Sequence, residues 1–184
     1  MRILLALALM TGPAFAADCP APADVSDELT TLFEKARAAP DFRAGRVVSE
    51  KMWEVWLRAP DEAAQEVLDK GMARRDSYDF LGALTEFDRL VDYCPDYAQG
   101  FNQRAFVHYS REDHEKSLVD LDAALALQPQ HVAAQSGRAL TLMNLGRIAE
   151  AREQLLIAVE NNPWLSEAAL LAKGAPLGPI GEDI

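Results

Sequence analysis

Prolines at a fixed interval are the feature that most constrains what this chain can fold into. Pro95, Pro129 and Pro163 are separated by 34 residues each, and Pro60 lies 35 residues before the first of them. Between successive prolines, two helical patterns of apolar residues are divided by a polar turn, as at residues 110–113. A period of this length is typical of solenoids, in which each unit is one supersecondary element stacked on its neighbours. We therefore expect an all-α protein built from stacked helical hairpins.

Small and bulky residues recur in register in three successive units. The small positions are Gly71, Ala105 and Ala139 in the first helices, and Ala83, Ser117 and Ala151 in the second helices. Further along the second helices come Phe87, Leu121 and Leu155, and then Leu90, Ala124 and Ala158. The small residues allow paired helices to approach closely, and the bulky ones fill the space beside the crossing. Close packing alone explains this pattern.

In these positions the chain resembles tetratricopeptide repeat proteins, with units at residues 61–95, 96–129 and 130–163. The resemblance implies a right-handed alpha-alpha superhelix. The chain departs from the family at two positions of each repeat. Where the family usually has a Trp, this chain has Val67, Phe101 and Gln135, and where it usually has a Tyr, this chain has Arg74, His108 and Leu142. Residues 53–61, WEVWLRAPD, together with the N-terminus, resemble exported alphaproteobacterial proteins of this family.

Two flanking segments complete the predicted organisation. Residues 18–60 read as a Pro-rich arm followed by a hairpin of helices at 26–38 and 43–58, and this hairpin is either a degenerate fourth repeat or a separate element. We expect Trp53 and Trp56 to fill the contact between the hairpin and the first repeat. The alternative is an exposed aromatic strip that receives a partner. Within residues 164–184 we expect a capping helix at 164–173 and a mobile tail.

The N-terminus has the pattern of a secretory signal peptide at residues 1–17. Arg2 precedes a short apolar run, and Ala14-Phe15-Ala16 predicts cleavage after Ala16 or Ala17. A lipoprotein is the alternative because Cys19 follows closely, although Asp18 stands where a lipobox needs a small residue. We expect a periplasmic protein that is not inserted in the membrane after cleavage.

Two cysteines, Cys19 and Cys94, are present in the chain. An even number of cysteines in an oxidising compartment favours a disulfide. Such a bond would close a loop of about 75 residues and contribute roughly 4.5 kcal/mol in the chain-entropy account. The alternative is two free thiols, with Cys94 half-buried at the end of a helix.

Charge and motif content argue against several functional classes. Asp and Glu number 29 against 18 Lys and Arg, and such an acidic chain is repelled by nucleic acid and by anionic lipid. His108, His114 and His131 lack metal-ligand spacing, so we expect no metal. No phosphate-binding loop or nucleophilic triad is visible, so we expect neither a cofactor nor an enzyme.

The concave groove implied by the resemblance is the predicted binding site for a protein or peptide. Its positions are Gln65, Leu68, Met72, Arg75, Gln99, Asn102, Phe106, Tyr109, Ala133, Ser136, Leu140 and Met143. Amides can bond a peptide backbone, while methionine and aromatic rings can pack against its side chains. Only Arg75 and Asn102 suit a clamp for a terminal carboxylate. The alternative is that Phe106, Leu140 and Met143 are buried against neighbouring units or against the N-terminal hairpin.

The function predicted from these features is non-catalytic binding. We expect a scaffold or adaptor of the bacterial cell envelope that holds its partner in the concave groove. The alternative is a periplasmic chaperone or assembly factor for exported proteins, of the kind that serves cytochrome c maturation or outer-membrane assembly.

Overall fold

The chain folds into paired helices throughout the part that the structure describes. The structure is a computed structural model and describes residues 18–179, so the expected signal peptide lies outside it. The helices are α1 (Ser26–Ala38), α2 (Phe42–Trp56), α3 (Glu62–Asp76), α4 (Phe80–Tyr93), α5 (Ala98–Ser110), α6 (His114–Leu127), α7 (Val132–Asn144), α8 (Ile148–Asn161) and the 3-10 helix η1 (Ser166–Leu171). Residues 18–179 contain no strand, and the prediction of an all-α fold is confirmed.

Local signals explain where several of these helices begin and turn. Asp41, Asp61 and Asp79 cap α2, α3 and α4, each accepting a hydrogen bond from a backbone N–H three residues later. The turns inside the three repeats each contain a residue with positive φ, at Tyr78, Glu112 and Gly146. These three are spaced by 34 residues, so the backbone of the turn repeats with the same period as the helices.

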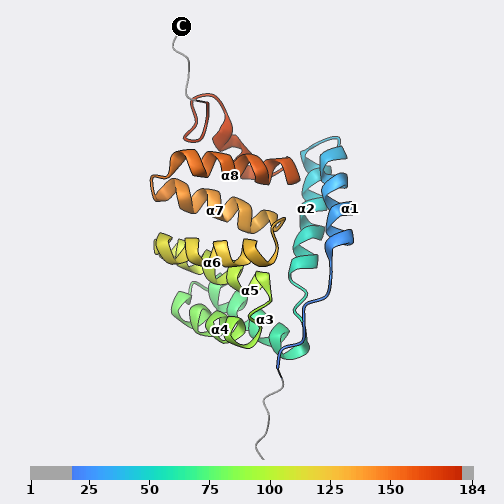
Figure 1. Cartoon of the computed structure of the whole chain (residues 1–184), viewed down its shortest axis with the longest axis vertical. Coiled ribbons are helices and arrows are strands. Elements are labelled where there is room, and N and C mark those ends of the chain that lie inside the picture. Colours follow the sequence, from blue (N-terminus) through green and yellow to red (C-terminus); the bar gives the residue numbers. More distant parts are fainter. Residues whose placement is uncertain (1–17, 180–184) are drawn as a thin grey trace, which may run out of the picture.

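Helices α3 to α8 stack as three hairpins, one above the other (Figure 1). Within the first hairpin, Gly71 lies so close to the ring of Phe87 that a Cβ atom would have no room there. Arg104 donates to Asp88 and Asp120, and Arg138, one repeat later, donates to Asp122 and Gln154. Each of these arginines thus joins the second helices of adjacent units, which fixes how one hairpin sits on the next.

The hairpin of α1 and α2 runs along the side of this stack (Figure 1). Its apolar face forms one buried cluster with Val132, at the start of α7, and α1 also contacts α8. The indole N–H of Trp164 donates to the carbonyl of Ala36 at 2.7 Å. The hairpin therefore does not extend the stack as a fourth layer, because its apolar face is covered by the third unit and the segment after it.

The two tryptophans of α2 have different surroundings. Trp56 is buried and its ring stacks on His131 at a centroid distance of 4.4 Å, at the start of the third repeat. Trp53 meets it edge-on and keeps 39% of its surface exposed. The expectation that both fill a contact with the first repeat is wrong for Trp56, because α2 crosses the stack and its buried face meets the third unit.

The C-terminal segment caps the third repeat in a way that the sequence did not predict. A 3-10 helix takes the place of the α-helix expected at residues 164–173. Residues 174–179 of the tail expected to be mobile turn back, so that Leu177 is fully buried in a cluster with Leu142 and Leu155, while residues 180–184 lie outside the described residues. The exposed apolar face of the last hairpin has to be covered, and the Gly- and Pro-containing turns bring Leu177 onto it.

The N-terminal arm is joined covalently to the first repeat. Cys19 and Cys94 form a disulfide, with their Cα atoms 5.2 Å apart. This bond ties the start of the arm to the end of α4. No helix among residues 18–179 is long and apolar enough to cross a bilayer.

Candidate binding groove

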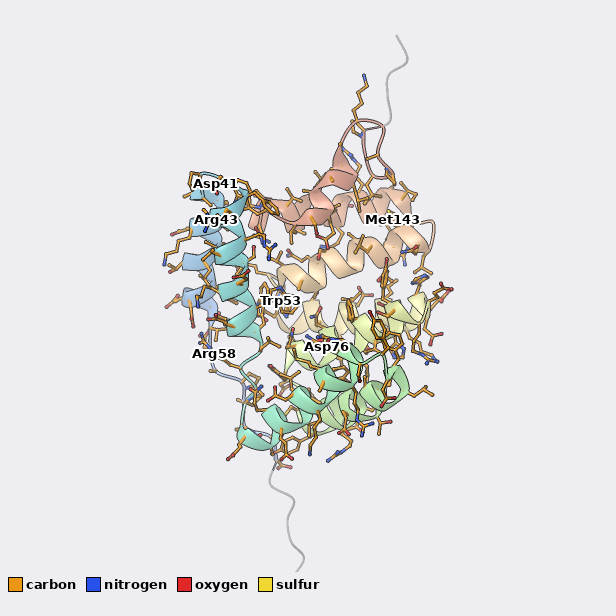
Figure 2. The ribbon with its side chains drawn as sticks, turned by 180° about the vertical axis from the view of Figure 1, so that it is seen from behind. Asp41, Arg43, Trp53, Arg58, Asp76 and Met143 are labelled. Atoms are coloured by element: carbon orange, nitrogen blue, oxygen red, sulfur yellow. A yellow bond between two sulfur atoms is a disulfide. The ribbon has the colours of Figure 1, made fainter. Side chains whose placement is uncertain are left out.

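A groove of about 710 Å³ lies between the first helices of the repeats and α2. Figure 2 shows the molecule from behind, with Trp53 on α2 and Asp76 at the end of α3. The repeats provide the floor of the groove through α3, α5 and α7, while α2 supplies one wall. The N-terminal hairpin is thus part of the site, although it is not part of the repeat.

Most of the predicted groove positions line this groove. They are Met72, Arg75, Asn102, Phe106, Tyr109, Ala133, Ser136 and Leu140. Phe106 keeps 52% of its surface exposed, so burial against neighbouring units does not account for it. Leu140 is partly buried and faces the same space. The repeat register therefore places these side chains together as expected.

Four predicted positions lie outside the groove. Leu68 is fully buried in the core of the first repeat, and Met143 packs against the core of the third. Gln65 accepts a hydrogen bond from the backbone N–H of Ala59 at 3.0 Å. Gln99 is buried beside His131. Leu68 and Met143 face the cores of their own repeats, whereas Gln65 and Gln99 are engaged on the side of the N-terminal hairpin.

Several lining residues were missed by reasoning from the repeat register. They are Trp53, Leu57, Asp76, Tyr78, Phe80, Gln103, Thr141 and Glu167. For Trp53, exposure to a partner was considered only as the alternative, as part of an aromatic strip with Trp56. One signal was present at Tyr78, where an aromatic residue stands at a turn position that holds Glu112 and Gly146 in the other repeats.

Aromatic side chains cluster at the end of the groove that is formed by the first repeat and α5. Tyr78 is 81% exposed and its ring lies 6.0 Å from that of Phe80. The guanidinium of Arg75 lies over the ring of Phe106, 5.4 Å from its centroid. Exposed rings at this density offer flat apolar surfaces to a partner's side chains.

The charged groups of the groove include one cation, and it is already compensated. Arg75 forms an ion pair with Asp76 at 2.7 Å and also donates to the side-chain oxygen of Gln103. The carboxylate of Glu167 has no cation partner among residues 18–179. The lining therefore carries two carboxylates against one guanidinium, and a clamp for a terminal carboxylate is absent from the groove as described.

A buried polar chain lies behind the groove floor. The backbone N–H of Ala134 donates to Nδ1 of His131, and Nε2 of His131 is 2.8 Å from the side-chain oxygen of Gln99. The same oxygen accepts a hydrogen bond from Nδ2 of Asn102 at 3.1 Å. Complete burial lowers the pKa of His131 to about 3, so the ring is neutral at physiological pH. Since Nδ1 accepts, Nε2 carries the proton and donates to Gln99.

Metal binding finds no support in the geometry. Among residues 18–179 there is no group of three or more His, Cys, Asp or Glu side chains that could hold an ion. His108 lies 3.9 Å from Asp120 and 3.8 Å from Asp113, and burial lowers its pKa. The ring lies beside the ion pair of Arg104 and Asp120 that joins the stacked units.

The chain was compared with known protein families, with curated proteins and with solved structures. No family model matches the chain. It is 35% identical over 71 residues to a tetratricopeptide repeat protein 36 homolog of Nematostella vectensis, covering 39% of each chain. It is 36% identical over 64 residues to a TPR repeat-containing protein of Rhizobium etli, covering 35% of this chain and 31% of the relative. The chain thus spans less than half the length of these curated relatives.

Among solved structures, the chain is similar to the first TPR of Spaghetti (RPAP3) bound to the HSP90 peptide SRMEEVD. The TM-score is 0.56 at 21% identity, covering 58% of this chain and 84% of that one. At this identity the likeness concerns the fold. The predicted superhelix of helical hairpins is confirmed by it, together with the eight consecutive α-helices of residues 18–179.

Proposed function

Because the chain carries tetratricopeptide repeats, we propose that it is a non-catalytic binding protein whose groove holds a segment of a protein partner. The observation that carries the proposal is the exposure of Trp53, Tyr78 and Phe106 on one concave surface. A folded protein gains by covering such side chains, and an exposed apolar concavity is typical of a binding site. The structure of the RPAP3 domain bound to its peptide supports the capacity of this fold to hold a peptide.

We propose further that the protein acts in the bacterial cell envelope. The expected signal peptide supports export, and the Cys19–Cys94 disulfide supports an oxidising compartment. In that setting the groove would serve a scaffold or adaptor. The test is fractionation of cells that express the full chain, followed by mass measurement of the periplasmic form. Recovery of the uncleaved chain in the cytoplasm would contradict export.

The second candidate is a chaperone or assembly factor for exported proteins. The flexible side chain of Met72 among aromatic rings favours it, because such surfaces adapt to many sequences. Cross-linking in the envelope distinguishes the two functions. One stoichiometric partner indicates a scaffold, whereas many unfolded exported clients indicate a chaperone.

The residue that best tests the groove is Phe106. We expect Phe106→Ala to weaken partner binding by about tenfold or more, because the loss of an exposed aromatic anchor removes much of the binding energy of a small interface. The free energy of unfolding should change by less than about 1 kcal/mol, because the ring is half exposed. Binding is measured as recovery of the cross-linked partner and stability by urea unfolding.

Phe42→Ala is the matched control. Phe42 is exposed to 55%, close to the value for Phe106, but it lies on α2 outside the groove. We expect the control to bind like the unchanged protein. Equal loss of binding in both variants, or a large loss of stability in Phe106→Ala alone, would contradict the groove.

A further inference from the structure

Among the charged side chains that line the groove, the acceptors Asp76 and Glu167 outnumber the one cationic donor, Arg75. The side-chain amide nitrogen of Asn102 donates a buried hydrogen bond to the side-chain oxygen of Gln99. Its amide oxygen has no hydrogen-bond partner among residues 18–179, and Asn102 lines the groove. Asp76 and Glu167 add carboxylates to the same lining. Arg75, the cation among the lining residues, is already bonded to Asp76 and Gln103.

The direction of the Asn102 amide is set by the chain behind it. The backbone N–H of Ala134 occupies Nδ1 of His131, so the proton of the neutral ring is on Nε2 and points at the Gln99 oxygen. That oxygen also faces the amide group of Asn102, which donates to it through its nitrogen. Turning the Asn102 amide over would place two oxygens against each other in a buried site, at a cost of about 1–3 kcal/mol. The amide oxygen of Asn102, a groove-lining residue, is therefore the atom left without a partner among residues 18–179.

We infer that the groove selects an extended apolar segment that carries lysine or arginine, and that it rejects acidic segments and free carboxyl termini. This inference rests on the proposed function. Acceptors at Asn102 and Glu167 match the N–H groups of a peptide backbone and the ammonium or guanidinium of a basic side chain. The net charge of −11 acts in the same direction over longer distances, because it attracts basic segments and repels acidic ones.

Glu167 is the specificity-determining residue in this account. It comes from η1, after the repeats, and is partly buried at the edge of the groove. A carboxylate at this degree of burial interacts with a partner's cation more strongly than one in open solvent. Its counterpart on the repeats is Asp76, whose charge is shared with Arg75.

A displayed library of short random peptides tests the inference with the full, oxidised chain as bait. We expect the selected peptides to contain apolar residues together with Lys or Arg enriched about threefold or more, and to be depleted of Asp and Glu. With Glu167→Lys we expect the enrichment of basic residues to be lost and acidic residues to be tolerated. The matched control is Glu153→Lys on the exposed face of α8, which should select the same peptides as the unchanged protein.

The outcomes separate the inference from the proposed function. Selected peptides that are lost with Phe106→Ala but are rich in Asp and Glu, or that depend on a free carboxyl terminus, would overturn the inference and leave groove binding intact. Unchanged selection with Glu167→Lys would also overturn it. The same peptides recovered with and without Phe106→Ala, or no selection at all, would count against groove binding itself and against the inference with it.

Discussion

The stacked repeats and the N-terminal hairpin are held in different ways. In the stack, each contact recurs in the next unit, as when Arg104 and Arg138 join successive second helices. The hairpin is attached by contacts that occur once, among them the Cys19–Cys94 disulfide, the stacking of Trp56 on His131, and the bond from Trp164 to Ala36. The repeated region distributes its stability over many similar contacts, whereas the hairpin is held by contacts that have no counterpart elsewhere in the described residues. Because α2 walls the groove, the proposed binding site includes residues of both.

The stack should be most sensitive at the large side chains that fill the crossing of paired helices. Phe87 is fully buried and packs directly on Gly71. We expect Phe87→Ala to lower the free energy of unfolding by about 3–5 kcal/mol, because it leaves a cavity that the close helices cannot collapse to fill. Urea unfolding followed by circular dichroism measures the effect.

The control for this change is Leu81→Ala on the same helix. Leu81 is 66% exposed, so the effect should stay within about 0.5 kcal/mol. Suppose instead that Phe87→Ala unfolded only α3 and α4 and left α7 and α8 fully protected from hydrogen exchange. That result would contradict the idea that stability is shared among the stacked repeats.

Removal of the disulfide should act on the hairpin more than on the stack. We expect the pair Cys19→Ser and Cys94→Ala to lower the free energy of unfolding by about 2–4 kcal/mol, since the bond restricts a long loop of the unfolded chain. Hydrogen exchange should accelerate in α1 and α2 before it does in α5, because the arm then has lost its attachment to α4. The groove should weaken together with its α2 wall.

The disulfide itself can be checked on protein from the periplasm. Unfolded, unreduced protein should contain no titratable thiol, and two should appear after reduction. Two thiols before reduction would contradict the bond. Equal acceleration of exchange in α2 and α5 would show instead that the hairpin and the stack open as one unit.

The same difference explains how much could be predicted from the sequence. The 34-residue spacing located the paired helices of the stack, because a repeated pattern reports a repeated contact. Both helices of the hairpin were also expected, yet their placement was not, since Trp164 and Ala36 are 128 residues apart and nothing repeats to reveal such a contact.

For the groove too, residues on the repeats could be predicted from the sequence, whereas residues from other elements could not. Positions such as Met72, Asn102 and Phe106 follow from the register of the first helices and could be expected. Trp53 and Glu167 come from elements outside the repeats, so their place in the groove depends on how those elements dock. Gln99 was expected in the groove but serves the hairpin contact, because His131 is buried beneath Trp56 and needs an acceptor.

His131 lies where the hairpin meets the stack, and pH should act at this point. Burial lowers its pKa to about 3, whereas in the unfolded chain the group takes up a proton near pH 6.5. The unfolded state therefore binds more protons between these values, and stability falls as the pH falls. Between pH 7 and pH 5 we expect a loss of about 2 kcal/mol from this group, at roughly 1.4 kcal/mol per pH unit once the unfolded group is protonated.

The variant His131→Asn isolates this contribution. Asparagine can still cap α7 but does not titrate, so its free energy of unfolding should depend less on pH by about 2 kcal/mol over the same range. His108 is kept in both proteins, and its lowered pKa acts in the same direction, so it cancels in the difference. Identical pH dependence in the two proteins would mean that His131 accepts a proton in the folded state. If folded His131 stays neutral, the first amides to exchange at pH 5 should be those of α1 and α2. The His131 ring on which Trp56 stacks becomes protonated when this region opens, so opening is favoured there as the pH falls.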